Sequence, residues 1–256
     1  HLRPVLEEEL EKTGMAKLYR DIELPLCTVL YKMENRGIAI DRTQLEEFGQ
    51  MLSHRIDDCE KLIFSYSEEP FNINSTRQLG ELLFEKLALP PVKKTKTGYS
   101  TNADVLEKLK GKHPIIPAIM DYRMLTKLKS TYVDGLLKVI AADGRIHSHF
   151  NQTDTRTGRL SSTEPNLQNI PVRTQLGSEL RKFFVAKPGH ILLDADYSQI
   201  ELRILAHIAE DVEMKKAFAD GEDIHTVTAS QVFKMPLEFV TSTMRSRAKA
   251  VNFGIV

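Results

Sequence analysis

The sequence has few cysteines and no long hydrophobic run. Only 2 of its 256 residues are cysteines, and no apolar stretch approaches the roughly 18 to 20 residues that a transmembrane helix needs. No secretory signal peptide is recognisable at its start. With 41% hydrophobic and 27% charged residues, these absences argue against a membrane protein and predict a globular chain of one or two domains.

The two cysteines, Cys27 and Cys59, lie in segments of helical periodicity. Neither has a second cysteine or a histidine at the spacing of a zinc site, and the pair does not form the pattern of a disulfide framework. We therefore expect reduced thiols in the core of a cytoplasmic protein.

The balance of charge changes along the chain, although the net charge is zero. Residues 1–70 hold 9 basic and 15 acidic residues, residues 71–182 hold 18 and 10, and residues 183–256 hold 8 and 10. The middle region is therefore the cationic one. Such a region suits a polyanionic partner, although lysines solvated on helix faces would give the same asymmetry.

Hydrophobic periodicity predicts a mostly helical first half. The predicted helices cover residues 22–36, 41–69, 76–89 and 117–140. Gly37 is typical of a helix end, Asp41 is typical of a helix start, and either Ser75 or Thr76 could cap the third helix.

A basic segment follows the third of these helices. Residues 92–102 combine lysines with threonine, glycine and serine, which predicts a mobile surface loop. Its lysines are Lys93, Lys94 and Lys96. Such a loop can reach nucleic-acid phosphates through charge and hydroxyl donors, or it can be a solvated turn. Arg123 and Lys127, four residues apart on the next helix, are placed to follow a phosphate backbone.

From Gly144 onward the helical period is lost, and short alternations predict a strand followed by an ordered loop. His147 and His149 form an HxH pair, which on a strand packs or solvates more often than it binds a metal. The loop is rich in planar side-chain donors that suit phosphates and base edges. These donors are Arg156, Arg159, Asn166, Gln168, Asn169 and Arg173.

Three long motifs then occur in order. They are TGRLSSTEPNLQNIP at residues 157–171, DYSQIELR at residues 196–203 and RSRAKAVNFG at residues 245–254. In order and spacing they resemble the motifs of family A DNA polymerases, of the bacterial DNA polymerase I type. The resemblance implies an α+β fold with a right-hand architecture of thumb, palm and fingers.

The same resemblance divides the chain into regions. Residues 1–40 would be a helical lead-in on the palm, residues 41–144 the helical thumb, residues 145–199 part of an antiparallel palm sheet, and residues 200–256 the first helices of the fingers.

The segment ILLDADYSQ, residues 191–199, has the pattern of an apolar strand that ends in acid. A buried strand would hold Asp196 rigidly at its end, where a carboxylate can bind a divalent cation. By resemblance, Asp196 bridges two Mg²⁺ ions in nucleotidyl transfer. Asp194 would point to the same side, but it does not match a ligand position of the family. Taken alone, DAD also fits the DxD motif of a sugar-nucleotide transferase.

Arg245, Lys249 and Phe253 recur every four residues and so share one face of a predicted helix. On their own they fit an ordinary amphipathic helix. The resemblance implies that Arg245 and Lys249 neutralise the triphosphate of an incoming dNTP, and that Phe253 packs on its sugar or base. The expected catalytic residues are Asp196, Lys249 and Arg245.

The resemblance implies further contacts with the two substrates. Glu201 would exclude a 2′-hydroxyl and so select dNTPs, whereas without the family it is an acid at a helix start. His225 would lie near the terminal phosphates, with a solvent-facing histidine as the alternative, and Arg173 would lie near the nucleotide. The residues expected to contact the primer–template in its minor groove are Arg159, Asn166, Gln168 and Asn169.

These inferences predict a monomeric, nucleoid-associated bacterial DNA-directed DNA polymerase. Its partners would be primer–template DNA and dNTPs, with no membrane partner, and its cofactors two Mg²⁺ ions. In the family, a tyrosine of the nucleotide pocket and a second metal-binding aspartate come later than NFGIV, where this sequence stops. We therefore expect these 256 residues alone to be inactive. The alternative is a non-catalytic fragment that binds primer–template DNA.

Overall fold

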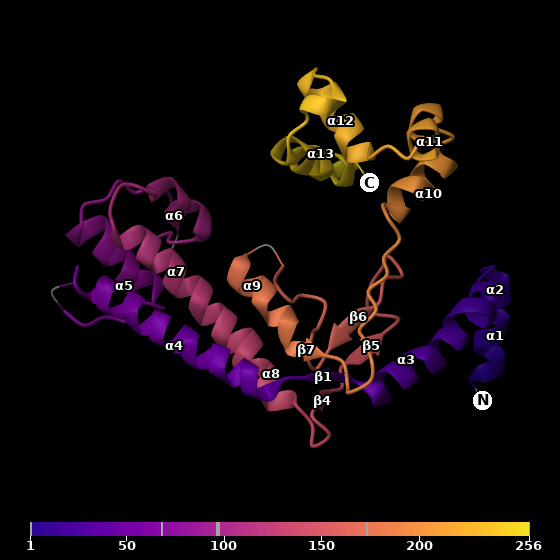
Figure 1. Cartoon of the computed structure of the whole chain (residues 1–256), viewed down its shortest axis with the longest axis horizontal. Coiled ribbons are helices and arrows are strands. Elements are labelled where there is room, and N and C mark those ends of the chain that lie inside the picture. The colour runs from indigo at the N-terminus through magenta and orange to yellow at the C-terminus, as the bar shows by residue number, and fades with distance from the viewer. Residues whose placement is uncertain (1, 68, 96–97, 173, 256) are drawn as a thin grey trace. The chain divides into compact units, whose positions relative to one another are not determined.

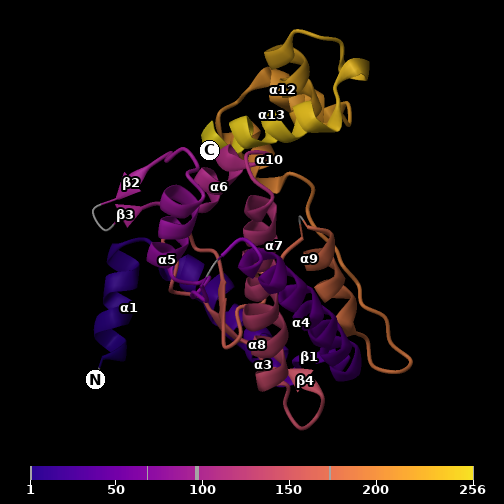
Figure 2. The same cartoon turned by 90° about the vertical axis from the view of Figure 1, so that its left-hand side faces the viewer.

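The computed structural model describes residues 2–67, 69–95, 98–172 and 174–255, except the side chains of residues 94, 95, 253 and 255. It divides into two compact units, His1–Leu192 and Leu193–Val256. Helices dominate, and small antiparallel sheets occur in the first unit (Figures 1 and 2), which confirms the α+β class. In the part of the chain that the structure describes, no helix has the length and apolar character needed to cross a membrane.

The first unit begins with helices. These are α1 (Arg3–Lys12), α2 (Ala16–Leu18), a π-helical segment at Tyr19–Glu23 and α3 (Leu24–Arg36). α3 ends at Gly37, as predicted. Arg145 Nε donates to the Arg36 carbonyl at 2.6 Å, and His147 Nδ1 donates to the Glu34 carbonyl at 2.7 Å. These bonds satisfy carbonyls that a helix end leaves without an intrahelical partner.

A three-stranded antiparallel sheet adjoins the end of α3. Its strands are β1 (Ile38–Ile40), β4 (Arg145–Ile146) and β7 (Phe184–Val185), in the order β4-β1-β7. Ile38 lies opposite Ile146, and Ala39 lies opposite Val185. A separate ribbon pairs β5 (His149–Asn151) with β6 (Ser161–Thr163). The strand predicted after Gly144 is thus present as short strands. We call residues 152–169, which include β6, the polar loop.

Helix α4 (Arg42–Phe64) is the long amphipathic helix predicted to start at Asp41. The Asp41 carboxylate accepts a hydrogen bond from the Gln44 amide at 3.0 Å, which satisfies one free N–H group of the first turn. α4 packs along α7 (Ile115–Lys127), and the two helices lie side by side in Figures 1 and 2. α7 continues through a π-helical segment, Leu128–Val133, into α8 (Asp134–Val139).

Shorter elements complete the first unit. They are α5 (Thr76–Glu81), the π-helical Leu82–Lys86, α6 (Ala103–Leu109), α9 (Gln175–Glu179) and the 3-10 turn Leu180–Phe183. Ser75, one of the two residues predicted as possible caps, is the cap of α5, and Thr76 is the first helical residue. The basic segment predicted as a loop instead contains an antiparallel pair, β2 (Lys94–Thr95) and β3 (Gly98–Tyr99). Its backbone groups bond to each other, which composition alone does not indicate.

Two clusters of buried apolar side chains stabilise the first unit. One joins α4 to α5, α6 and α7 and includes Leu79, Leu106 and Ile119. The other joins α4 to β1, β4 and α8 and includes Leu45 and Ile146. Burial of each such side chain contributes about 1.5–3 kcal/mol, so these clusters hold α4 against its neighbours at both of its ends.

The prediction for the cysteines is wrong in part. Cys59 is half-buried beside both clusters, whereas Cys27 is exposed on α3 and donates to Gln152 Oε1 at 3.0 Å. Within α3, the buried residue is Leu30. Helical periodicity identified the helix, but it did not identify which part of its apolar face becomes buried.

The second unit is helical. Its elements are α10 (Ile200–Ile208), α11 (Val212–Ala219), α12 (Ile224–Phe233), the 3-10 turn Leu237–Phe239 and α13 (Ser242–Ile255). Asp211 and Asp223 cap α11 and α12 by accepting from the Met214 and Thr226 amides, both at 2.9 Å. α12 packs against α13. The small apolar core of the unit contains Leu202, Ala217 and Ile224.

The predicted strand before Asp196 is absent. Residues 191–197 pair with no described segment, and Ile191 and Leu193 are each 86% exposed. An extended segment becomes a strand only when a neighbouring backbone completes its hydrogen bonds, and apolar composition does not supply that neighbour. Asp196 therefore lies on an exposed segment, and strand alternation does not orient Asp194.

Gly37 provides a test of the junction between α3 and the sheet. Its backbone, at φ 56° and ψ −173°, lies in a region that is essentially restricted to glycine. A Cβ here would lie 2.5 Å from the Ile146 carbonyl oxygen. We expect Gly37→Ala to lower the free energy of unfolding by about 1–3 kcal/mol from backbone strain, and further through this clash, in urea unfolding followed by circular dichroism.

Gly144→Ala is the matched control for this variant. Gly144 also has a positive φ, 74°, but a Cβ at this position would meet nothing within 4 Å. The left-handed backbone alone should cost about 1–2 kcal/mol. Equal losses in the two variants would contradict the proposed close approach of Gly37 to β4.

Candidate functional site

In the second unit, the Asp223 carboxylate accepts hydrogen bonds from three segments of the chain. Thr226 donates to Oδ1 from its amide at 2.9 Å and from its hydroxyl at 3.1 Å. Arg245, at the start of α13, donates from Nε to Oδ1 at 3.1 Å and from Nη2 to Oδ2 at 2.6 Å. Gln199, directly before α10, donates from Nε2 to Oδ2 at 3.0 Å.

These contacts fix the charge states of the pair. Burial raises the pKa of Asp223, but the hydrogen bonds from Arg245 and Thr226 outweigh it and lower the pKa to about 2. The same hydrogen bond acts in the opposite direction on its donor, because it raises the pKa of Arg245. Both groups therefore remain charged near neutral pH. The Arg245 side chain is still 43% exposed, so part of the guanidinium faces solvent.

His225 is nearly inaccessible, with 1% of its surface exposed, so the solvent-facing alternative is wrong. Its Nδ1 atom lies 3.0 Å from Asn252 Nδ2, which also donates to Thr228 Oγ1 at 3.2 Å. An amide nitrogen donates, so Nδ1 accepts and the neutral ring carries its proton on Nε2. Burial lowers the pKa of His225, and Arg245 and Lys249 lower it further against the opposing effect of Asp223.

Gln199 connects Asp223 to the segment that carries Asp196. It precedes α10 in a left-handed conformation, with φ 55° and ψ 35°. Its Nε2 atom bonds to Asp223, whereas its Oε1 atom is buried without a hydrogen-bond partner among the described residues. Asp196, three residues earlier, is exposed and makes no hydrogen bond or ion pair with the part of the chain that is described.

The remaining predicted nucleotide-site residues are distributed over α10 and α13. Glu201 is half-buried in the first turn of α10, and Lys249 is exposed one helical turn after Arg245. The predicted helix face of Arg245 and Lys249 is thus present in the backbone. The side chain of Phe253 and all of Arg173 lie outside the described residues.

Sequence reasoning missed Asp223, Gln199 and Asn252 as site residues. Asp223 precedes Thr226 by three residues in DIHT, which is a helix-start pattern that the sequence does contain. That pattern predicts the cap of α12 but not the bonds to Arg245 and Gln199. The latter pairings join residues 22 and 24 positions apart, and no local signal predicts them.

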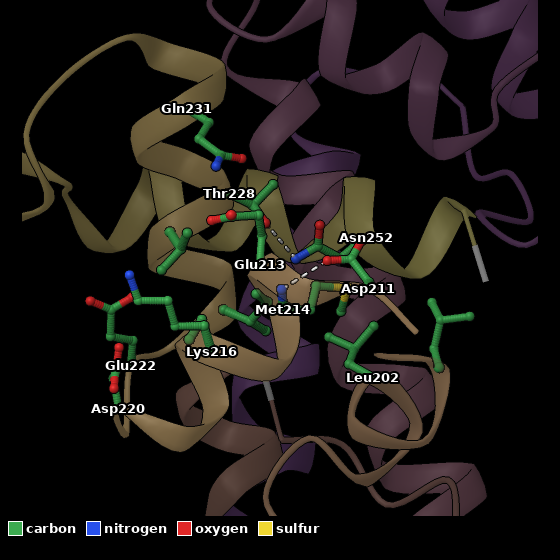
Figure 3. A pocket seen from close by; sticks show the side chains of 14 residues that line it. Leu202, Asp211, Glu213, Met214, Lys216, Asp220, Glu222, Thr228, Gln231 and Asn252 are labelled. Carbon is green, nitrogen blue, oxygen red and sulfur yellow. Dashed lines mark hydrogen bonds between the residues drawn. The ribbon is translucent and has the colours of Figure 1, made fainter. Parts of the chain in front are cut away.

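A cavity of about 570 Å³ lies between the helices of the second unit (Figure 3). Apolar side chains such as Leu202 and Met214 line it together with Asp211, Glu213 and Asn252. Within the described residues, none of the predicted catalytic or nucleotide-binding side chains lines this cavity. Its shape is therefore no evidence for the predicted nucleotide site.

In the first unit, the polar loop holds four of the predicted DNA-binding residues exposed. They are Arg159, Asn166, Gln168 and Asn169. Gln168 Nε2 donates to the Leu160 carbonyl at 3.1 Å, and Tyr132 Oη donates to the Asn169 carbonyl at 2.7 Å. The hydroxyls of Ser148 and Ser162 are buried and lie 2.7 Å apart. The loop is thus held by internal bonds while its side chains remain accessible.

The predicted cations of the helical region differ in their surroundings. Lys93 and Lys127 are exposed, whereas Arg123 is half-buried and donates to the carbonyl and hydroxyl of Thr101. Burial lowers the pKa of Arg123. Arg123 therefore ties α7 to the segment before α6. The Lys94 side chain and all of Lys96 lie outside the described residues.

The HxH pair makes polar contacts with α3 and a neighbouring turn. His147 Nδ1 donates to the Glu34 carbonyl, and Nε2 lies 3.2 Å from Asp143 Oδ2. His149 Nδ1 lies 3.6 Å from Glu34 Oε2. Among the residues described, no group of three or more His, Cys, Asp or Glu side chains is arranged to hold a metal ion.

Comparison with known proteins gives consistent matches. The family model of DNA polymerase family A matches residues 42–256. DNA polymerase I of Bacillus subtilis (strain 168) is 51% identical over 257 residues, covering 100% of this chain and 29% of that protein. DNA polymerase I of Caldicellulosiruptor bescii is 55% identical over 240 residues, covering 93% of this chain and 28% of that protein. The chain thus spans less than a third of the length of these relatives.

A solved structure is also similar over almost the whole chain. It is the POL domain of Pol1 from M. smegmatis in complex with a DNA primer-template and dNTP. The TM-score is 0.88 at 44% sequence identity, and the match covers 98% of this chain and 44% of that one.

The surroundings of His147 and His225 shift the pKa values of the two rings in opposite directions, which can be tested. The hydrogen bond to the Glu34 carbonyl raises the pKa of His147, with Asp143 acting in the same sense, whereas burial lowers that of His225. In an NMR titration from about pH 5 to 8, the His147 ring should titrate above 6.5 and the His225 ring below it. His147→Gln and His225→Gln assign the signals, and the reverse order would contradict both environments.

Because the pKa of each ring differs between the folded and unfolded states, each histidine also makes the free energy of unfolding depend on pH. The His147 contribution is fully present below pH 6.5 and is lost as the pH rises through its folded-state pKa. The His225 contribution is present above pH 6.5 and is lost as the pH falls through its lowered folded-state pKa.

Proposed function

Because the chain belongs to DNA polymerase family A, we propose that it forms part of a DNA-directed DNA polymerase. This enzyme transfers the nucleotidyl group of a dNTP to a primer 3′-hydroxyl, as directed by a template, and releases pyrophosphate. The observation that carries the proposal is the placement of Arg245 and Lys249 one turn apart on α13, in the same compact unit as Asp196. Triphosphate neutralisation and metal binding require these two kinds of charge.

The proposal includes a right-hand architecture. Residues 41–144, with α4 to α8, form the thumb, residues 145–199 part of the palm, and residues 200–256, with α10 to α13, the start of the fingers. Residues 1–40 form the lead-in on the palm, which the hydrogen bonds between α3 and residues of β4 and β5 support. The protein would act as a monomer on DNA in the bacterial nucleoid.

Asp196 is the proposed metal ligand. Its exposed carboxylate has no partner in the described chain, so its oxygens suit a hard cation such as Mg²⁺. Two Mg²⁺ ions, when bound, would stabilise the attacking and leaving oxygens of nucleotidyl transfer. Asp196 supplies only one protein carboxylate, so the remaining ligands would come from the substrates, water and other carboxylates.

The nucleotide would be held by residues of the second unit. Arg245 and Lys249 neutralise its phosphates, and Glu201 excludes a 2′-hydroxyl from the sugar. His225, with its proton on Nε2, would donate to a terminal phosphate, which requires the buried ring to become accessible. The roles of Phe253, which packs on the sugar or base, and of Arg173, near the nucleotide, rest on the family resemblance alone.

The primer–template would be held by exposed donors of the first unit. Arg159, Asn166, Gln168 and Asn169 project from an internally bonded loop, which suits contacts to minor-groove acceptors present in every base pair. The cations proposed to contact the phosphate backbone are Lys93, Lys94, Lys96, Arg123 and Lys127. The solved relative from M. smegmatis is bound to a primer-template and dNTP, which supports primer–template DNA and dNTP as the partners proposed for this chain.

Substitution of Asp196 tests the proposed function. In the full-length polymerase, we expect Asp196→Ala to lower kcat at least about 10³-fold, or about 4 kcal/mol of transition-state stabilisation. The Kd for primer–template should change less than about threefold, because phosphate contacts dominate affinity for DNA. Primer extension and fluorescence anisotropy measure the two quantities.

Asp194→Ala is the matched control, because Asp194 is also exposed and lies two residues earlier. It should leave kcat within about threefold of the unsubstituted enzyme. Similar losses in the two variants would contradict the assignment of the metal ligand to Asp196.

We also propose that the 256-residue chain alone does not extend a primer. A two-metal reaction needs ions held by more protein ligands than the single carboxylate of Asp196. With labelled primer–template, Mg²⁺ and dNTPs, the isolated chain should shift the DNA in a gel but give no extended product, whereas the full-length polymerase gives both. Extension by the isolated chain would contradict this proposal and leave the family assignment intact.

A further inference from the structure

Asp223 fixes the position of the Arg245 guanidinium. The carboxylate accepts from both Nε and Nη2, at 3.1 and 2.6 Å, so the planar group is held along one edge. In the described part of the chain, Nη1 has no hydrogen-bond partner, and the side chain is 43% exposed. The edge that remains is therefore available to a phosphate oxygen.

The same carboxylate is itself held from two other directions. Thr226 bonds to Oδ1 at the start of α12, and Gln199 bonds to Oδ2 before α10. Asp223 cannot turn away from Arg245 without breaking bonds to both segments. Its pKa of about 2 keeps it charged throughout the range in which a polymerase works. Arg245 thus has a permanent and well-oriented partner.

We propose that Asp223 is a positioning residue for nucleotide binding, which orients Arg245 so that its free edge meets the triphosphate. This inference rests on the proposed function, in which Arg245 binds the nucleotide. An arginine held in place loses less conformational entropy on binding a phosphate than one that moves freely. The negative charge of Asp223 also partly cancels the positive charge of Arg245, which weakens its attraction for a phosphate. Loss of the orienting contact would therefore raise the KM for dNTP, whereas loss of the negative charge would lower it.

Asp223→Asn separates orientation from capping. Asparagine caps helices as well as aspartate does, so the start of α12 is retained. Asparagine, however, has an NH2 group in place of Oδ2, the oxygen that accepts from Arg245 Nη2 and Gln199 Nε2. Two donors would then face each other, which breaks the two-bond contact with Arg245. In the full-length polymerase we expect the KM for dNTP to rise about tenfold, with kcat within about threefold and the primer–template Kd unchanged. An unchanged or lowered KM would overturn the proposal.

Asp211→Asn is the matched control in the same unit. Asp211 caps α11 through the Met214 amide at 2.9 Å, as Asp223 caps α12, but it has no arginine partner among the described contacts. The substitution should leave the KM for dNTP unchanged. A similar rise in KM for both variants would mean that helix capping, and not the orientation of Arg245, causes the effect.

A double substitution identifies the residue through which Asp223 acts. If Asp223 works through Arg245, adding Asp223→Asn to Arg245→Ala should not raise the KM further, although each single variant raises it. A full additional increase would overturn the proposal. If Arg245→Ala itself leaves the KM unchanged, the triphosphate role in the proposed function fails. If Arg245→Ala raises the KM but Asp223→Asn does not, only the positioning role fails.

Discussion

The ion pair between Asp223 and Arg245 is the interaction on which the proposed nucleotide site depends. Through one carboxylate, the starts of α12 and α13 and the residue before α10 share a common partner. A carboxylate that accepts several hydrogen bonds stays ionised, and an ionised carboxylate in turn keeps its donors in place. The charge of Asp223 thus holds its donors in place, and the donors in turn keep Asp223 charged. This arrangement requires all three segments, because no single helix supplies every hydrogen bond.

The polar loop of the first unit applies the same principle without charge. The buried hydroxyls of Ser148 and Ser162 bond to each other and to the Pro165 carbonyl, so a segment with few apolar residues still has satisfied polar groups. Exposed donors such as Arg159 and Asn166 then project from a supported backbone. The DNA contact proposed for this loop would have to work with any base sequence, so it needs donors that are held in position more than donors that recognise one particular base.

The features that were predicted from the sequence alone are those that depend on residues close together in the chain. The end of α3 at Gly37, the cap of α4 at Asp41 and the helix of Arg245 were all predicted, because helix starts, ends and faces are local properties. The strand before Asp196 was not obtained, because a strand needs a partner from elsewhere in the protein. The role of Asp223 was missed for a related reason, since its bonds to Gln199 and Arg245 join distant segments.

The two halves of the proposed site therefore differ in preorganisation. Arg245 is fixed by Asp223, whereas Asp196 lies on a segment without strand pairing. A metal site needs ligands held to within a fraction of an ångström, so the acidic half requires a further constraint that the cationic half already has. If a neighbouring strand paired with residues 191–195 and an apolar layer packed on that sheet, Ile191 and Leu193 would be buried, each contributing about 1.5–3 kcal/mol. The same pairing would fix Asp196, so stability and metal geometry would arise from one event.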